Sequence, residues 1–358
     1  MLARTTSLPS RAASIHRFCR VVVTLSGVVA GAVVSGGSQW IAEHVFHDPN
    51  VQVSIFIAGI ALPFAVSANY QTGAIAGLSD FAGLAKAAVA GAITLIAGAS
   101  IGAWIAGTTG ALVGLLLSLV VRASVGAIVL RARTTTSLMR TPDIGLRETW
   151  REIRHFAVPT LLSGLTAMLA LWLSNAVLTS HAGAQAFGVF TSAFLIKTLV
   201  TFIPLQFGSV LLSRLSNLSA RGDVDASRRT HTITVLMGAG IAFVLAAALV
   251  IGADHVMAVF GPGFEEGAPI LRWLMLCAIF EATATLAFLS FPGRGKWMLG
   301  AAVYAVPKDF VLVIAALFLV DRFGAVGLAW AHTSSWLYGL VAIGVLNGLR
   351  MYRARVRN

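Results

Sequence analysis

The sequence predicts an all-α polytopic membrane protein with about ten transmembrane helices in two lobes, four in the first and six in the second. Composition is the first observation, because 57% of the 358 residues are hydrophobic, only 11% are charged and the mean hydropathy is +0.85. A soluble domain has about 25% charged residues, so this chain has too little polar surface to face water. The composition therefore excludes a water-soluble single-core enzyme, a disordered chain and a disulfide-stapled secreted domain.

Apolar runs are the second observation, since a helix that spans a bilayer needs ~20 predominantly apolar residues. The sequence contains ten such runs: 21–42, 51–78, 83–106, 109–130, 155–180, 187–211, 232–253, 267–291, 297–320 and 323–349. The segments between them are too short for an appended soluble domain of the usual ~100 residues. The activity of the chain is therefore expected within or beside the membrane.

Charge placement is the third observation. Of the 26 Lys and Arg residues, 21 lie at the termini or in alternate loops, as the positive-inside rule requires. The opposite loops contain mainly Asp and Glu. Both termini are therefore predicted to be cytoplasmic, and the net charge of +12 needs no nucleic-acid partner to explain it.

A polar segment divides the runs into two groups. Residues 131–154 contain Pro142 and Gly145 and have the composition of a cytoplasmic linker. We therefore expect an N-terminal lobe at 1–154 and a C-terminal lobe at 155–358. Short external turns at 110–114 (Gly-Ala-Leu-Val-Gly) and 324–327 (Gly-Ala-Val-Gly) are similar, but such matches are common in a glycine-rich chain. Internal repeats are frequent in transporters, and the sequence leaves open whether these turns belong to one.

Six ionisable residues lie inside the apolar runs, where a charge usually faces a bundle interior or a water-filled cavity. They are Arg122, Lys197, Arg272, Glu281, Lys308 and Asp309. If all six face one cavity, its net charge is about +2, which suits an anionic substrate. Lys197 and Lys308 are the strongest candidates, because each has about ten mostly apolar residues on either side and cannot easily reach the interface.

Internal ion pairing is the alternative role for these charges. Adjacent side chains on a helix point about 100° apart, so in this alternative Lys308 pairs with Glu281, and Asp309 with Arg272, on a neighbouring helix. Arg122 lies nearer the cytoplasmic end, where snorkelling to the inner headgroups explains it equally well. The amides of Gln71 and Asn175 lie in runs that contain proline, where they line a cavity or hydrogen-bond between helices.

Motifs of catalysis and metal binding are missing from the sequence. It has no Walker-type loop, no His-Glu-x-x-His and no Gly-x-Ser-x-Gly, and its two cysteines lack metal-ligand spacing. Asp223-Val224-Asp225 has the Asp-x-Asp form of metal-dependent glycosyltransferases, but its loop is short and rich in Arg. Glu265-Glu266 is the one external cluster available to a membrane-embedded glycosyl- or acyltransferase. We expect no catalytic residue, no cofactor and no metal.

Three segments carry a family resemblance. They are Tyr70-Gln71-Thr72-Gly73 with Gly77-Leu78, His155-Phe156-Ala157-Val158-Pro159 with Trp172-Leu173-Ser174-Asn175, and Val259-Phe260-Gly261-Pro262-Gly263-Phe264. They are similar to segments of Wzx-type polysaccharide (O-antigen) flippases, which belong to the multidrug/oligosaccharidyl-lipid/polysaccharide exporter superfamily. The resemblance extends over essentially the whole chain. Because such proteins have two six-helix lobes, the four-plus-six division leads us to expect that the first helical hairpin is lacking.

The resemblance implies export without bond-making. An oligosaccharide on polyprenyl diphosphate would pass from the inner to the outer leaflet of the bacterial cytoplasmic (inner) membrane by alternating access, for surface polysaccharide such as lipopolysaccharide. The implied partners are this lipid-linked oligosaccharide, the bilayer, a polysaccharide polymerase and other glycan-assembly proteins.

The resemblance also assigns roles to the intramembrane residues. The anionic diphosphate would contact Lys197, Lys308 and Arg122, and the remaining predicted substrate-binding residues are Arg272, Asn175 and Gln71. Glu281 and Asp309 are the candidates for coupling to protons or sodium. A multidrug or small-solute antiporter of the same fold is the alternative, although the buried carboxylates that bind organic cations are only weakly represented.

Overall fold

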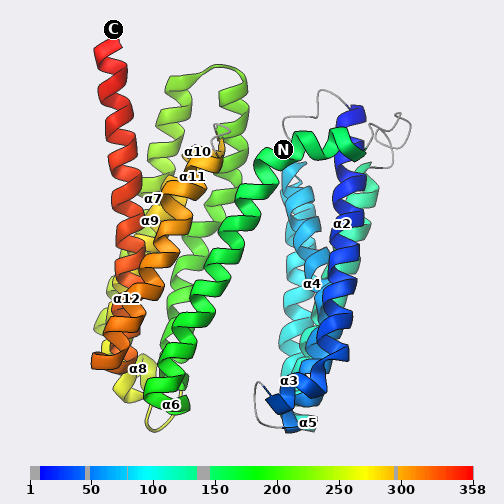
Figure 1. The fold of residues 1–358 in the computed structure, drawn as a ribbon, viewed down its shortest axis with the longest axis vertical. Helices are drawn as coiled ribbons and strands as arrows, with labels where there is room; N and C mark the ends of the chain where they lie inside the picture. Colours follow the sequence, from blue (N-terminus) through cyan, green and yellow to red (C-terminus); the bar gives the residue numbers. More distant parts are fainter. Residues whose placement is uncertain (1–8, 45–48, 79, 135–145, 294–296, 358) are drawn as a thin grey trace. The chain divides into compact units, whose positions relative to one another are not determined.

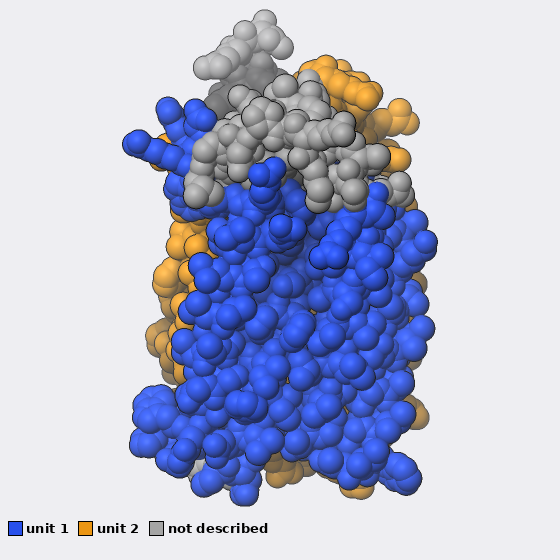
Figure 2. Space-filling view, turned by 90° about the vertical axis from the view of Figure 1, so that its right-hand side faces the viewer, with its two compact units in different colours: residues 1–153 blue, residues 154–358 orange. Residues whose placement is uncertain are grey.

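The computed structural model describes residues 9–44, 49–78, 80–134, 146–293 and 297–357. All regular secondary structure within these ranges is helical, which confirms the predicted all-α class (Figure 1). The chain divides into two compact units, Met1–Ile153 and Arg154–Asn358 (Figure 2). Residues 135–145 of the predicted linker, with Pro142 and Gly145, lie outside the described residues.

The described part of unit 1 contains three long helices, two short ones and the first residues of α6 (Leu146–Ala220). The long and short helices are α2 (Pro9–Gly36), α3 (Ser38–His44), η1 (Pro49–Val51), α4 (Gln52–Gly77) and α5 (Phe81–Thr134). The long helices lie side by side, and α4 packs against both α2 and α5 (Figure 1). The predicted run 21–42 differs from the structure, because α2 begins well before it and a turn at Gly37 separates α2 from α3.

Unit 2 takes most of α6, which starts at the end of unit 1, and all later helices. They are α6 (Leu146–Ala220), α7 (Val224–Ile251), α8 (Ala253–Ala258), η2 (Glu265–Gly267), α9 (Ala268–Phe288), α10 (Ser290–Gly293), α11 (Trp297–Gly300), the π-helix η3 (Ala301–Ala305) and α12 (Val306–Arg357). Helix α9 packs against α7 and α12, and more than half of its apolar window is buried. It is the centre of the unit.

Three helices are too long for a single membrane crossing. The apolar stretches contain 52 residues in α5, 62 in α6 and 50 in the run that passes through α11 and η3 into α12. Each is broken at a glycine with positive φ: Gly107, Gly183 or Gly324. In Figure 1, α6 accordingly forms two antiparallel arms. The described residues contain seven apolar helices long enough to cross a membrane. Dividing three of them at these glycines gives ten crossings, in agreement with the ten predicted runs.

The turns at Gly107 and Gly324 have nearly the same backbone geometry, with φ/ψ of 56°/−137° and 55°/−131°. Three residues later, Gly110 and Gly327 let the second arm approach the first. A Cβ added there would lie 1.9 Å and 2.1 Å, respectively, from a carbonyl oxygen of the first arm. The two hairpins therefore correspond, with Gly107 aligned to Gly324 and Gly110 aligned to Gly327. The sequence comparison of 110–114 with 324–327 aligns Gly110 with Gly324, three residues out of register.

Candidate functional site

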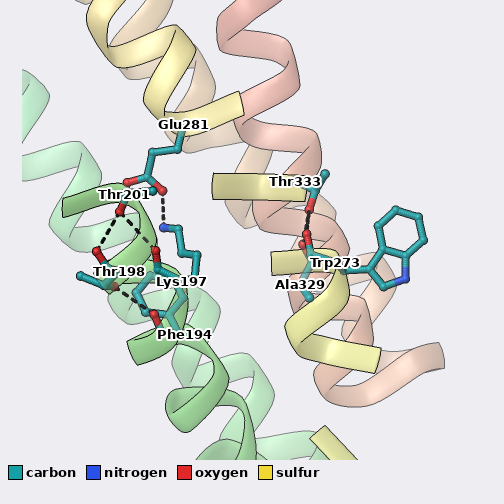
Figure 3. A network of polar contacts seen from close by, with 8 residues as sticks. All are labelled: Phe194, Lys197, Thr198, Thr201, Trp273, Glu281, Ala329 and Thr333. Carbon is teal, nitrogen blue, oxygen red and sulfur yellow. Dashed lines mark hydrogen bonds and ion pairs between the residues drawn. The ribbon is translucent and has the colours of Figure 1, made fainter. Parts of the chain in front are cut away.

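Lys197 on α6 and Glu281 on α9 point toward each other and form an ion pair inside unit 2 (Figure 3). Their side chains are 4% and 14% exposed. The Lys197 ammonium also lies 4.4 Å from the centroid of the Phe194 ring, one helical turn away. A buried ammonium requires this compensation, because a lone charge in a membrane-spanning segment is costly.

Hydroxyl groups support the helices that carry this pair. Thr201 donates to the backbone carbonyls of Lys197 and Thr198, at 3.3 Å and 3.1 Å. Thr333 on α12 donates to Ala329 at 2.8 Å and to the Trp273 carbonyl of α9 at 3.3 Å, which joins α12 to α9 (Figure 3). Such bonds satisfy the hydroxyl within the helix and hold the backbone that positions the charges.

Lys308 and Asp309 form a second ion pair at the start of α12. The ammonium of Lys308 donates to Oδ1 of Asp309 at 2.5 Å and lies 4.4 Å from the Trp336 ring centroid. Oδ2 of Asp309 accepts a hydrogen bond from Thr166 of α6 at 3.0 Å. Ser335 donates to the Lys308 carbonyl at 2.7 Å and joins the two arms of α12.

The alternative role, internal ion pairing, holds in unit 2 with other partners than the two pairs that the sequence suggested, Lys308–Glu281 and Asp309–Arg272. Lys308 pairs with its neighbour Asp309 rather than with Glu281, although adjacent backbone directions diverge by about 100°. The Lys side chain is long and flexible enough to bring its ammonium back to the next carboxylate. Glu281 is thereby left to Lys197, which the sequence did not connect with it.

Arg272 does not join this group of buried charges. It lies near the start of α9 and pairs at 2.6 Å with Asp254 of α8, and the two side chains are 44% and 63% exposed. The Asp309–Arg272 pair of the alternative is therefore absent among the described residues. Among the described residues, the buried charges of unit 2 are two lysines and two carboxylates in pairs, so they have no net charge. The +2 counted for six residues in one cavity included Arg272 and also Arg122 of unit 1.

His332 is a member of the group that the sequence analysis missed. The residue is 4% exposed. Its ring stacks on the Phe190 ring, with the centroids 5.9 Å apart, and its centroid lies 5.2 Å from that of Phe194, the ring that contacts Lys197. Its Nε2 atom is buried and has no hydrogen-bond partner in the described structure. The available signal was a histidine within the apolar run 323–349, which a count of groups charged at neutral pH omits.

Arg122 occupies a different environment in unit 1. It lies on the second arm of α5, is half-buried, and donates to the Thr72 hydroxyl of α4 at 3.2 Å. In the part of the chain that the structure describes, no carboxylate pairs with it. Gln71, next to Thr72, has a buried Oε1 without a partner, and Asn175 of α6 has a buried Oδ1 in the same condition.

The corresponding hairpins place these cations in related positions. Counted from the two turn glycines, Lys308 corresponds to Gly91 and Arg122 corresponds to Gly339. A Cβ added at Gly91 would lie 3.0 Å from Cβ of Arg122, and one added at Gly339 would lie 3.6 Å from Cδ of Lys308. Each hairpin therefore has one cation that packs across a glycine of the other arm, but the cation is on opposite arms in the two units.

The acidic motifs outside the buried group have structural explanations. Asp223 caps α7 by accepting the Ala226 N–H at 3.0 Å, and Asp225 lies in the first turn of that helix, where a negative charge is favourable. Glu265 and Glu266 are exposed in η2. Across the described ranges, no group of three or more His, Cys, Asp or Glu residues is placed to hold a metal ion.

The fold is shared with solved transporters of the MOP superfamily. One, a MOP superfamily transporter from Pyrococcus furiosus with a binding pocket of reverse polarity, superimposes with a TM-score of 0.81 and 19% identity, over 100% of this chain and 82% of the other. Another, an outward-facing multidrug resistance MATE family transporter, superimposes with a TM-score of 0.80 and 19% identity, over 98% of this chain and 81% of the other. The chain thus has the fold of a MOP superfamily transporter.

Within that class, the chain belongs to the polysaccharide biosynthesis protein family, which it matches over residues 16–268. The EPS I polysaccharide export inner membrane protein EpsE of Ralstonia solanacearum is 25% identical over 218 residues, which are 60% of this chain and 49% of the relative. EpsE of Ralstonia nicotianae is 25% identical over 225 residues, which are 61% of this chain and 51% of the relative. The chain spans about half the length of these curated relatives. The resemblance to polysaccharide exporters is confirmed.

Proposed function

We propose that this transporter moves an oligosaccharide carried on polyprenyl diphosphate from the inner to the outer leaflet of the bacterial inner membrane. The observation that carries the proposal is that two buried lysines, Lys197 and Lys308, are each paired with a carboxylate. Ionisable groups inside membrane-spanning segments are costly and usually mark substrate or ion pathways. A diphosphate is an anion that can take the place of a carboxylate beside an ammonium. Membership of a polysaccharide biosynthesis family and the inner-membrane export role named for the relatives support this substrate class.

The residues receive distinct roles in this proposal. Lys197, Lys308 and Arg122 contact the diphosphate, and the unpartnered amide oxygens of Gln71 and Asn175 accept hydrogen bonds from sugar hydroxyls. Glu281 and Asp309 are the groups through which proton or sodium binding is coupled to transport. Arg272 is left out of the site, because its exposed pair with Asp254 satisfies it elsewhere.

The proposed mechanism is alternating access of an N-terminal lobe at 1–154 and a C-terminal lobe at 155–358, without bond-making. Both termini face the cytoplasm, as the positive-inside rule predicts. A polysaccharide polymerase and other glycan-assembly proteins are the proposed partners on the same pathway. The proposal assigns the chain no enzymatic step.

Complementation of a flippase-deficient bacterial strain tests this function, with surface polysaccharide as the readout. We expect the chain to restore polysaccharide and Lys197→Met to abolish rescue at equal membrane abundance. Lys86→Met is the matched control, because Lys86 is an exposed lysine on α5 and its loss should leave rescue intact. Undiminished rescue by Lys197→Met would remove this lysine from the substrate path.

A multidrug antiporter is the second candidate, because the fold is shared with a multidrug resistance MATE family transporter. Such a protein needs a carboxylate that is free to bind an organic cation. Among the described residues of unit 2, the buried carboxylates Glu281 and Asp309 are already paired with lysine. We therefore expect cells that express the chain to show no resistance to tetraphenylphosphonium; resistance that Glu281→Gln removes would favour this second function.

A further inference from the structure

Glu281 and an incoming anion have the same partner. We propose that Lys197 and His332 form an anion site that Glu281 closes, and that Glu281 must take up a proton before the site accepts the diphosphate. This inference rests on the proposed function for the identity of the anion. It adds the residue that opens the site and the direction in which proton and substrate binding influence each other.

The first step is the occupancy of Lys197. Its ammonium is almost completely buried and is already held by the Glu281 carboxylate and the Phe194 ring. A second anion brought to the same ammonium would meet the carboxylate, and two like charges at one buried site repel strongly. Moving Glu281 away while it is still charged would leave a buried charge without a partner, which is costly. Protonation removes both obstacles because it frees the ammonium and leaves a neutral carboxyl group.

The second step is the contrast with Asp309. Its carboxylate has two donors, the Lys308 ammonium at 2.5 Å and the Thr166 hydroxyl at 3.0 Å. The Glu281 carboxylate has Lys197 as its one partner among the described residues. Opening the Glu281 pair breaks fewer interactions than opening the Asp309 pair. Glu281 is therefore the carboxylate that opens, and Asp309 keeps Lys308 in place.

The third step is the second donor. His332 lies against Phe194, the same ring that contacts Lys197, and its Nε2 atom is buried and unpartnered. A neutral imidazole donates from one nitrogen, and the tautomer with a proton on Nε2 has a donor ready for a phosphate oxygen. An anion that replaces Glu281 at Lys197 thereby also gains a hydrogen bond from His332.

The other titratable groups around Glu281 do not replace it in this role. Cys277 lies one turn earlier on α9, Tyr304 comes from η3, and Lys308 and Asp309 come from α12. Helix α7 brings His231, whose imidazole N–H donates to the Ala287 carbonyl at 3.1 Å near the other end of α9. Lys197 from α6 is the group in ion-pair contact with Glu281.

The charge balance sets the sign of the coupling. The closed pair is neutral; it becomes a single positive charge when Glu281 gains a proton, and an anionic phosphate group then offsets that charge. Proton and anion therefore bind together, and each increases the affinity for the other by the same factor. When one proton is taken up per anion, the Kd falls up to about tenfold for each unit by which the pH is lowered.

Proton uptake by the purified full chain in nanodiscs is the direct test. The probe is a farnesyl-diphosphate ester of glucose, whose phosphates are both esterified and do not compete for the proton. Calorimetric titration at about pH 6.5, in two buffers with different heats of ionisation, counts the protons bound with each probe molecule. We expect about one proton to be taken up with each probe molecule. An uptake of zero, a release of protons or no binding at any pH would overturn the proposal.

Variants assign the proton to Glu281. Glu281→Gln should bind the probe with no proton uptake and with the same Kd across the pH range, whereas Glu265→Gln, which removes an exposed carboxylate of η2, should behave as the parent chain does. Wild-type uptake in Glu281→Gln would transfer the proton to another group and refute the closure by Glu281. Should Glu281→Gln fail to fold, the proton count of the parent chain still decides whether a proton and the anion bind together.

His332→Phe keeps a ring of similar size and should weaken probe binding about tenfold while proton uptake stays at one. Unchanged affinity would remove His332 from the site.

The proposed function and the closure of the anion site by Glu281 can be refuted separately. Translocation of a lipid-linked oligosaccharide without proton-linked binding would refute the closure alone. Proton-linked binding without translocation would refute the proposed function and leave the anion site.

Discussion

The two units treat their interior cations differently. In unit 1, the Arg122 guanidinium is half-buried and held by the Thr72 hydroxyl, with no carboxylate partner among the described residues. In unit 2, Lys308 at the related level of its hairpin has both Asp309 and the Trp336 ring. A guanidinium is more weakly hydrated than an ammonium and needs less compensation when it leaves water, whereas a buried ammonium requires a counter-charge. The difference shows that one of two corresponding hairpins can have a cation bound by a neutral hydroxyl, while the other has a cation neutralised by a carboxylate.

Packing differs between the units as well. Unit 1 has one small cluster of buried apolar residues in its described part, around Ala74, Ile75 and Leu130, and the arms of its α5 hairpin meet backbone to backbone at Gly102 and Gly110. Unit 2 surrounds α9 with a much larger apolar cluster. Both units have a close glycine contact within a hairpin, at Gly110 and at Gly327, but unit 2 adds extensive side-chain burial around α9.

Glu281→Gln should have the largest effect on stability, because it leaves the Lys197 ammonium buried without its counter-charge. We expect a loss of about 3–5 kcal/mol. The double variant Lys197→Met with Glu281→Gln should recover most of this loss, since neither charge then remains. Unfolding of the purified variants in detergent measures both effects, and a double variant no more stable than the single one would contradict the pairing.

Gly102→Ala tests the glycine contact of unit 1. The added methyl group would lie 2.1 Å from the Gly110 carbonyl oxygen, so the arms of α5 must separate, at a cost of about 1–3 kcal/mol. Gly73→Ala is the control within the same unit, because no atom lies within 4 Å of the added Cβ and alanine favours the helix. Thermal unfolding compares the variants; equal stability of the two would show that the arms do not meet at Gly102.

Thr166→Val sharpens the contrast between the two carboxylates of unit 2. It removes the hydrogen bond to Asp309 with little change of shape, and we expect a loss of about 1 kcal/mol. Thr191→Val is the control, because Thr191 is exposed and its hydroxyl donates within its own helix, to Phe187 at 2.8 Å. If both variants unfold at the same denaturant concentration, Thr166 does not support Asp309.

Arg272→Ala should have the smallest effect, below about 1 kcal/mol, because solvent screens the exposed pair with Asp254. The effect should decrease further as salt is added. Unfolding at low and high ionic strength measures this dependence. A large, salt-independent loss would place Arg272 in a buried network instead.

The site was only partly predictable from the sequence. Lys197 and Lys308 were identifiable because a lysine in the middle of a long apolar run has no route to the interface. His332 was not, since an uncharged histidine in such a run looks like an ordinary core residue until its ring is seen beside Phe194 and Lys197. The relation between Arg122 and Lys308 also required the structure, because it depends on the matched turns at Gly107 and Gly324.

The sequence by itself determined the all-α class and the ten crossings. A bilayer has no water to satisfy backbone groups, so each crossing must be a helix of ~20 apolar residues, and that requirement is visible in local composition. The tertiary structure alone decided that Lys197 pairs with Glu281 and Lys308 with Asp309, while Arg272 pairs with Asp254. Ion pairs depend on which helix faces lie together and on how far a flexible side chain can reach, and neither quantity is written in the residues next to a charge along the chain.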